Sequence, residues 1–329
     1  MGRYLVTGCA GFIGSHLSEA LVAAGDEVVG IDSFTSYYPR RVKEANLAEL
    51  RDSSRFTLVK ADLTGAPLPR VLDGIDAVFH LAAQPGVRQS WGRDFSVHLQ
   101  RNLLASQRVF EAAAQAGLRV VFASSSSVYG EVEAYPTRED STVRPISPYG
   151  VSKLACEQLA SAYASSLELD FVALRYFTVY GPRQRPDMAF TRIISSLIAG
   201  SPFHIFGSGN QSRDFTYVTD AVSATRSALR SAPRGAIYNV GGGTEATLRD
   251  IISRCERLTG RTLNTRLERV APGDVTRTRA DTTRISAELC WKPTTDLDEG
   301  LATQIEFALS RSVTRRPVPR LMPAFEVSR

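Results

Sequence analysis

Three glycines spaced three residues apart near the N-terminus constrain the fold of this 329-residue chain more than any other feature. Gly8, Gly11 and Gly14 follow a short apolar run, residues 4–6, and precede an apolar-periodic stretch that reaches residue 24. This order predicts a strand, a tight turn and a helix. Glycines at such a turn let the backbone approach a pyrophosphate, and the helix N-terminus offers unpaired N–H groups to the phosphates. The segment is typical of a dinucleotide-binding unit.

The next apolar run ends in an acidic residue. Residues 27–31 form this run, and Asp32 follows it, 18 residues after Gly14. A carboxylate at the end of the second strand accepts hydrogen bonds from the hydroxyls of an adenosine ribose. Because the same carboxylate repels a 2′-phosphate, we expect NAD rather than NADP as the cofactor.

Tyr149 and Lys153 lie four residues apart, so on a helix they share one face. The helix that they require begins at Pro148, after Ser147 as its N-cap, and extends to residue 166. A cation held beside a phenol favours the phenolate, which is the form that accepts a proton. A chance pairing of Tyr and Lys on a surface helix is the plainer alternative, and the glycine turn favours a reaction centre instead.

The middle of the chain alternates between buried strands and helices. Residues 57–61, 77–81 and 120–123 are mostly apolar, as buried parallel strands are. Residues 38–51 and 96–116 have helical character. This alternation predicts an α/β fold with a doubly wound, mostly parallel (Rossmann) sheet, whose ligands bind at the carboxyl ends of the strands.

Taken together, these segments resemble the extended short-chain dehydrogenases/reductases, within the nucleotide-sugar epimerase and dehydratase family. The resemblance covers residues 3–308, nearly the whole chain. The glycines of that family have the same three-and-three spacing. Further matching stretches are residues 62–63, 80–84, 124–130, 149–153, 175–177 and 207–220.

The resemblance implies two units between which the backbone crosses more than once. Residues 1–176 and 213–240 are expected to form an NAD-binding Rossmann domain. Residues 177–212 and 241–310 are expected to form a smaller C-terminal α/β lobe that binds the nucleotide sugar. Residues 311–329 form a basic, proline-containing tail with five arginines and one glutamate.

The resemblance also implies catalytic and cofactor-binding roles. Ser125, Tyr149 and Lys153 are the expected catalytic residues, and Ser125 would hydrogen-bond the reacting sugar oxygen and Tyr149. A serine run such as residues 124–127 is more often an ordinary loop, but this one directly follows a predicted strand. The residues expected to bind NAD are Gly8, Gly11, Phe12, Ile13, Gly14, Asp32, Asp62, Leu63, Leu81, Ala82, Ala83, Gln84, Asn102, Tyr149, Lys153 and Tyr176.

Residues expected to contact the substrate come from both units. By resemblance, Arg213 contacts the diphosphate, Arg277 adds a second contact, and Asp274 binds the uridine ribose. Phe206 flanks the uracil or is a buried core aromatic, and Thr178 stands where many relatives have Asn. The expected set is Arg88, Ser126, Ser127, Thr178, Arg185, Arg192, Phe206, Arg213, Asp274 and Arg277.

The two serines after Ser125 favour one reaction. Relatives that dehydrate the sugar carry Asp and Glu at these positions, and relatives that decarboxylate UDP-glucuronate carry Glu at the position of Ser127. This chain has Ser126 and Ser127 instead. What remains is the shared half-reaction, in which Tyr149 takes the proton of the sugar 4-hydroxyl while C4 passes a hydride to NAD. Reduction of the ketone from its other face gives the C4 epimer.

Two arginines bear on the identity of the sugar. The stretches around Arg88 and Arg185, and residues 37–38 with Lys43 behind them, are similar to those of UDP-glucuronate 4-epimerases. A guanidinium grips a carboxylate with two hydrogen bonds. Oxidising glucuronate at C4 creates a β-keto acid, and a clamp that holds its carboxylate bond near the ring plane suppresses loss of carbon dioxide. Arg185 is our first choice for this clamp; surface cations at Arg183 and Arg185 are the alternative.

Three functions stay open at this point. The first is an NAD-dependent UDP-sugar 4-epimerase, an isomerase, which most resembles those that convert UDP-glucuronate to UDP-galacturonate. The second is a UDP-hexose 4-epimerase or a UDP-glucuronate decarboxylase. The third is a non-catalytic, NAD-sensing regulator, against which the intact set of Ser125, Tyr149 and Lys153 argues.

Composition indicates which kinds of partner and which cellular compartment to expect. Most of the net charge of +5 comes from the tail, so we expect no nucleic-acid partner. The four cysteines lack metal-type spacing, so no metal is expected and the thiols are expected to be reduced. No apolar run suits a leader or a membrane span, which predicts a cytoplasmic protein without a membrane partner. Helical residues 96–116 and 152–166 have small, apolar faces that either pair in a homodimer or pack on their own sheet.

Overall fold

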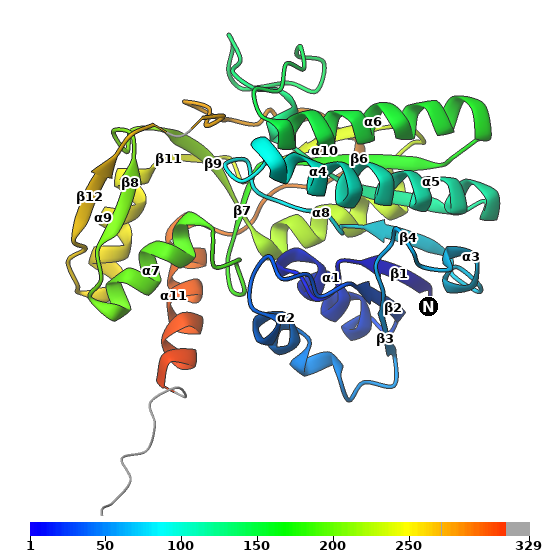
Figure 1. Ribbon diagram of the computed structural model, residues 1–329, viewed down its shortest axis with the longest axis horizontal. Coiled ribbons are helices and arrows are strands. Elements are labelled where there is room, and N and C mark those ends of the chain that lie inside the picture. Colours follow the sequence, from blue (N-terminus) through cyan, green and yellow to red (C-terminus); the bar gives the residue numbers. More distant parts are fainter. Residues whose placement is uncertain (271, 314–329) are drawn as a thin grey trace, which may run out of the picture.

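The structure is a computed structural model that describes residues 1–270 and 272–313 (Figure 1). The basic tail expected over residues 311–329 lies outside the described residues from 314 onward. Its first three residues belong instead to helix α11, Leu297–Val313. Among the described residues, no helix has both the length and the hydropathy that crossing a bilayer requires.

Seven parallel strands form the main sheet, in the order β10-β6-β5-β4-β1-β2-β3. Both faces of a parallel sheet are covered, which is why these strands are nearly continuous apolar runs. The strand order changes direction between β1 and β4, and a crevice opens at such a switch point. The doubly wound, mostly parallel α/β fold is therefore confirmed. The strands are β1 Arg3–Thr7, β2 Glu27–Asp32, β3 Phe56–Lys60, β4 Ala77–His80, β5 Arg119–Ser125, β6 Phe171–Tyr176 and β10 Ile237–Val240.

Successive side chains of a strand point to opposite faces of the sheet, so these strands contribute to two cores, one on each face. Val6 packs with Leu17 in one core, and Leu5 packs with Phe110 in the other. Helices α5 and α6 lie side by side along one face (Figure 1). The helices are α1 Phe12–Ala23, α8 Val218–Ser231 and α10 Thr283–Leu289 on the first face, and α3 Leu68–Val71, α5 Ala105–Ala116 and α6 Pro148–Leu167 on the second.

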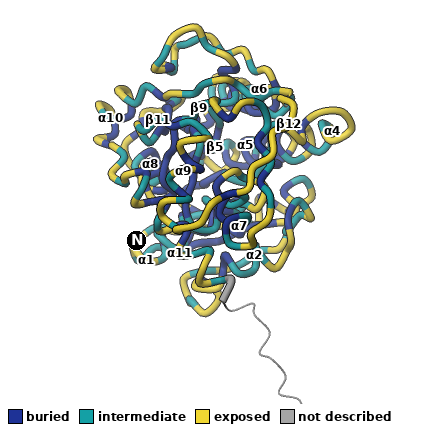
Figure 2. The backbone as a smooth tube through the Cα atoms, turned by 90° about the vertical axis from the view of Figure 1, so that its left-hand side faces the viewer, coloured by how far each residue is buried: buried dark blue, intermediate teal, exposed yellow. Residues whose placement is uncertain are grey.

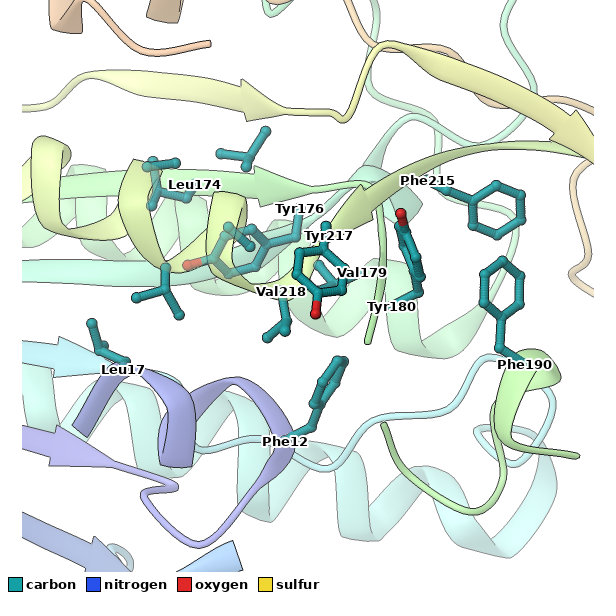
Figure 3. Packing of buried hydrophobic residues seen from close by; sticks show 14 of the residues in the cluster. Phe12, Leu17, Leu174, Tyr176, Val179, Tyr180, Phe190, Phe215, Tyr217 and Val218 are labelled. Atoms are coloured by element: carbon teal, nitrogen blue, oxygen red, sulfur yellow. The ribbon is translucent and has the colours of Figure 1, made fainter. Parts of the chain in front are cut away.

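A smaller lobe combines two short sheets, ordered β11-β9-β7 and β12-β8, with three helices. Its core is continuous with that of α1, since Tyr180, Phe190 and Phe215 join the same cluster as Leu174 (Figure 3). The ring centroids of Phe190 and Phe215 lie 4.7 Å apart. Strand β12 is exposed along its length (Figure 2). These elements are β7 Thr178–Tyr180, β8 Phe203–Phe206, β9 Ser212–Tyr217, β11 Thr244–Thr247, β12 Thr265–Glu268, α7 Ala189–Ala199, α9 Leu248–Thr259 and α11.

Two predicted helices are broken into shorter pieces. The helix expected over residues 38–51 is α2, Arg40–Asn46, followed by a 3-10 turn, Ala48–Leu50. The helix expected over residues 96–116 consists of α4, Phe95–His98, a π-helical segment, Leu99–Leu104, and α5. The helix from Pro148 is confirmed with its cap, because the Ser147 hydroxyl accepts a hydrogen bond from Gly150 N at 3.1 Å.

Strand pairing moves two boundaries of the expected units. Residues 213–217, expected in the Rossmann domain, belong to β9, which pairs with β7 and β11 of the smaller lobe. Helix α10, expected in that lobe, packs on β10 and α8 of the main sheet. The division into two units stays our proposal, with α8 as the first element of the return to the main sheet.

Candidate active site

A cavity of about 870 Å³ runs along the carboxyl ends of the main-sheet strands and extends to the smaller lobe. Residues of β2 and β5, and residues that directly follow β1 and β4, line one end, and residues of α7, β8 and β9 line the other. Every site residue that the sequence predicts lines this cavity, except Gln84, Asn102 and Arg277.

The glycine turn at one end leaves no room for side chains. Gly8 has φ +71°, and its N–H donates to the Ile31 carbonyl at 2.8 Å. A Cβ on Gly14 would lie 2.2 Å from the Gly8 carbonyl oxygen. No side chain caps α1, whose N-cap is Gly11. The bare turn and uncapped helix N-terminus fit the pyrophosphate of a dinucleotide.

Asp32 lies at the next strand end with both oxygens held by the backbone. Oδ2 accepts from Ala10 N at 3.2 Å, and Oδ1 accepts from Phe34 N at 2.7 Å. The Lys43 ammonium lies 3.8 Å from Oδ1 and donates to Thr35 Oγ1 at 3.1 Å. The carboxylate keeps lone pairs for ribose hydroxyls, so these residues fit the adenosine end of NAD.

Asn102 acts on the cavity through a neighbouring loop. Its Oδ1 accepts from Gln84 N at 2.7 Å, and its Nδ2 donates to Gln84 O and to Ser152 Oγ. Asn102 and Gln84 were expected to bind the cofactor, but neither lines the cavity. Asn102 is engaged with the Gln84 backbone, and the side-chain oxygen of Gln84 accepts from Arg101 Nη1 at 3.0 Å. Asn102 thereby ties the loop after β4, whose residues Leu81–Ala83 line the cavity, to α6.

The three expected catalytic residues converge at the ends of β5 and α6. Lys153 is buried, and its ammonium donates to the Ala123 carbonyl at 2.8 Å. The Ser125 hydroxyl donates to Ser127 Oγ and accepts from Ser127 N, both at 3.1 Å. Tyr149 packs its ring edge to face with His98, at 6.2 Å between centroids. All three line the cavity, which therefore contains a phenol, a hydroxyl and an ammonium.

A buried polar network behind these residues was not predicted from the sequence. Glu157 accepts two hydrogen bonds from the Arg175 guanidinium, at 3.0 and 2.7 Å, and a third from the Ser124 hydroxyl. Arg175 also donates to Tyr129 Oη at 2.8 Å. Glu157 lies four residues after Lys153, so it falls on the same face of α6 as Tyr149 and Lys153. This spacing was the sequence feature that could have indicated the network.

The other end of the cavity carries the expected substrate residues. Arg88 pairs with Asp274 at 2.7 Å, and its guanidinium lies 4.3 Å from the centre of the Phe206 ring. Burial lowers the pKa of Arg213, and a substrate phosphate beside it would offset that effect. Arg277 lies outside the lining, because Glu245 holds its guanidinium at 2.7 and 2.8 Å.

Arg185 also lines the cavity, and it is already paired. Its Nε and Nη2 donate to the two carboxylate oxygens of Asp187, each at 3.0 Å. The Tyr37 hydroxyl donates to Asp187 Oδ2 at 3.2 Å. Asp187 and Tyr37 were not among the predicted site residues, although Asp187 lies two residues after Arg185 and Tyr37 lies in the segment of residues 37–38 that resembles the family. Within the described part of the chain, no cluster of side chains suits a metal ion.

The chain is similar to known proteins over most of its length. The model of the NAD dependent epimerase/dehydratase family matches residues 4–241. An uncharacterized UDP-glucose epimerase, YtcB, of Bacillus subtilis (strain 168) is 42% identical over 311 residues, covering 94% of this chain and 98% of that protein. A UDP-glucuronate 4-epimerase of Thermodesulfobacterium geofontis (strain OPF15) is 36% identical, covering 94% and 96%.

Among solved structures, the crystal structure of a UDP-glucuronic acid 4-epimerase from Bacillus cereus, in complex with UDP-glucuronic acid and NAD, superimposes with a TM-score of 0.91. The two sequences are 41% identical, over 94% of this chain and 99% of that one.

The fold is that of a Rossmann-type enzyme, and its cavity lies between the carboxyl edge of the main sheet and the smaller lobe. Similarity extends over nearly the whole chain, and the chain belongs to the NAD-dependent epimerase/dehydratase family. The resemblance to extended short-chain dehydrogenases/reductases and the expected cofactor, NAD, are thereby confirmed.

We predict that His16, which follows the glycine turn, makes stability depend on pH. Burial lowers its pKa to about 4, and the ring is paired with the Pro182 carbonyl at 2.9 Å. A folded-state pKa below the unfolded value stabilises the fold above about pH 6.5, and this stabilisation is lost as the pH falls toward 4. At pH 5 the loss from His16 alone is about 2 kcal/mol.

Urea unfolding at pH 7 and pH 5 measures this effect. His16→Gln keeps a donor for the Pro182 carbonyl but does not titrate, so its free energy of unfolding should fall less than that of the wild type. Equal losses in the two proteins would contradict the prediction.

Proposed function

We propose that this protein is an NAD-dependent UDP-sugar 4-epimerase, and that its principal reaction interconverts UDP-glucuronate and UDP-galacturonate. The observation that carries the proposal is the position of Arg185 in the same cavity as Ser125, Tyr149 and Lys153. A carboxylate-binding guanidinium beside a proton-transfer set suits a uronic acid that is oxidised and reduced at C4.

Proton transfer falls to Tyr149. The phenolate removes the proton of the sugar 4-hydroxyl and later returns it, while the Ser125 hydroxyl hydrogen-bonds the reacting oxygen. The Lys153 ammonium, fixed by the Ala123 carbonyl, favours the phenolate through its charge. When bound, NAD accepts the C4 hydride and gives it back.

The positions after Ser125 support epimerisation over elimination or decarboxylation. Ser126 and Ser127 line the cavity, and both lack a titrating group at neutral pH. With no acid or base at these positions, the 4-keto sugar is expected only to be reduced again. Presentation of its other face gives the C4 epimer.

A neutral UDP-hexose is the second candidate substrate. The relative in Bacillus subtilis carries the description of a UDP-glucose epimerase, and it is more similar in sequence than the UDP-glucuronate 4-epimerase from Thermodesulfobacterium geofontis. The cavity residues for proton transfer would serve either sugar equally. Arg185 favours the uronate.

We predict that the purified protein converts UDP-glucuronate to UDP-galacturonate, and that Tyr149→Phe loses at least about 100-fold in kcat, because proton transfer contributes 10²–10⁴-fold. NMR of the products, recorded without and with added NAD, measures both the reaction and the retained cofactor. Lys292→Met, outside the cavity lining, is the control. Full activity of Tyr149→Phe would refute the role of the phenol.

We predict that Arg185→Ala releases carbon dioxide from the keto acid, so that UDP-pentose appears beside the epimer. Arg185→Lys should do so to a smaller extent, because an ammonium lacks the two-pronged grip of guanidinium. Chromatography of the nucleotide sugars gives the product ratio. An unchanged ratio in both variants, with unchanged uronate affinity, would contradict the clamp.

We also propose a homodimer in the cytoplasm. Leu99, Leu104 and Val151 are 40–46% exposed on the α5 and α6 side, and burial of this face in a twofold contact would remove apolar surface from water. The buried, unpaired thiols Cys9 and Cys156 agree with a reducing compartment. Light scattering should give twice the chain mass, and Leu104→Glu should halve it; a monomeric wild type would refute the dimer.

A further inference from the structure

Arg185 and Asp187 form a side-on fork inside the cavity. The fork uses Nε and Nη2 of Arg185, each 3.0 Å from a different oxygen of Asp187. A guanidinium has five N–H donors in one plane. The fork therefore leaves both hydrogens of Nη1 and one of Nη2 unused. One hydrogen from each of these two nitrogens points off the end of the guanidinium, and this pair is a second two-pronged site for a carboxylate.

Both members of the fork are anchored from elsewhere. The Tyr37 hydroxyl, from the loop after β2, donates to Asp187 Oδ2 at 3.2 Å. The loop that carries Arg185 is fixed to α1, because Arg183 Nη1 lies 2.8 Å from Glu19 Oε1 and the Pro182 carbonyl meets the His16 ring. The fork is thus held between the cofactor-binding sheet and the smaller lobe.

Asp187 also stabilises the charged form of Arg185. Burial acts to lower the pKa of this guanidinium, and the neighbouring Asp187 carboxylate raises it above its usual range. Without Asp187, the cation in the cavity would lack a counter-ion until an acidic substrate bound. With Asp187, the cation is satisfied in one fixed orientation beforehand.

We propose that Asp187 is a positioning residue that determines how the substrate carboxylate is held. It fixes the plane of the Arg185 guanidinium so that the free edge grips the C6 carboxylate of the sugar. This inference rests on the proposed uronate chemistry, which it deepens. Tyr37 supports Asp187 and acts in the same direction with a smaller effect.

The chain contains a matched control for this fork. Arg138 and Asp140 have the same spacing of two residues, with Nε and Nη2 at 3.1 and 3.3 Å from the two carboxylate oxygens. Their side chains are 68% and 72% exposed, against 21% and 28% for Arg185 and Asp187. Neither residue lines the cavity.

The experiment compares wild type, Asp187→Asn, Tyr37→Phe and the control Asp140→Asn with UDP-glucuronate. An asparagine accepts only one of the two hydrogen bonds of the fork, so the guanidinium loses its fixed plane. We expect Asp187→Asn to lower kcat about tenfold and to raise the UDP-pentose fraction, because misplacement of about 1 Å is costly in catalysis. KM should change less than kcat, since removal of a negative charge offsets the poorer grip.

A double-mutant cycle on the affinity for UDP-glucuronate tests whether Asp187 acts through Arg185. Calorimetry with NAD present gives the affinity for UDP-glucuronate of wild type, Asp187→Asn, Arg185→Ala and the double variant. We expect Asp187→Asn to change affinity less than twofold when Arg185 is already alanine. Thermal unfolding confirms that each variant is folded.

Three outcomes separate the possibilities. Wild-type kinetics and product ratio in Asp187→Asn would overturn the positioning role, and so would an undiminished effect of Asp187→Asn on affinity in the Arg185→Ala background. A wild-type protein that binds UDP-glucuronate without converting it would refute the proposed function, and the double-mutant cycle would still decide the role of Asp187.

Discussion

The buried ion pair between Glu157 and Arg175 sets the geometry on which the site depends. Both side chains are at most 5% exposed, and loss of either partner would leave an uncompensated charge, which costs about 3–5 kcal/mol. Glu157 lies on α6, while Arg175 lies on β6 and Ser124 on β5. The pair therefore fixes the rotation of α6 against two strand ends. Tyr149 and Lys153 precede Glu157 on the same helical face, so the pair also constrains where these two side chains lie.

The end of the cavity at the smaller lobe depends on contacts between segments far apart in the chain. Arg88 follows β4, yet it pairs with Asp274, 186 residues later. Tyr37 follows β2 and reaches Asp187 in the segment before α7. Each contact joins a loop at the carboxyl end of the main sheet to the smaller lobe. Strands supply the edge of the cavity, and loops from both sides of it supply its ionic groups.

Local patterns were sufficient to predict the glycine turn, the end of β2 and helix α6, which all contribute to the cavity lining. The glycine turn, Asp32 and the Ser147 cap each depend on residues within a few positions of one another, so the sequence specifies them directly. The pairing of Gln84 with Asn102, and of Arg277 with Glu245, depends on tertiary contacts. These three predicted ligand-binding residues do not line the cavity. The π-helical segment before α5 gave no sequence signal, because it alters hydrogen bonding within a continuous helix.

Arg183 illustrates how the two ends of the cavity are joined. It has φ +65°, a conformation that costs a non-glycine residue about 1–3 kcal/mol. Glycine would avoid that cost but would lose the side chain, which reaches Glu19 at 2.8 Å and Ser15 Oγ at 3.3 Å on α1. A partly buried ion pair and a hydrogen bond offset the strain. The strained backbone at Arg183 thus lets α1, the helix that follows the glycine turn, hold the loop of Arg185, which joins the two ends of the cavity.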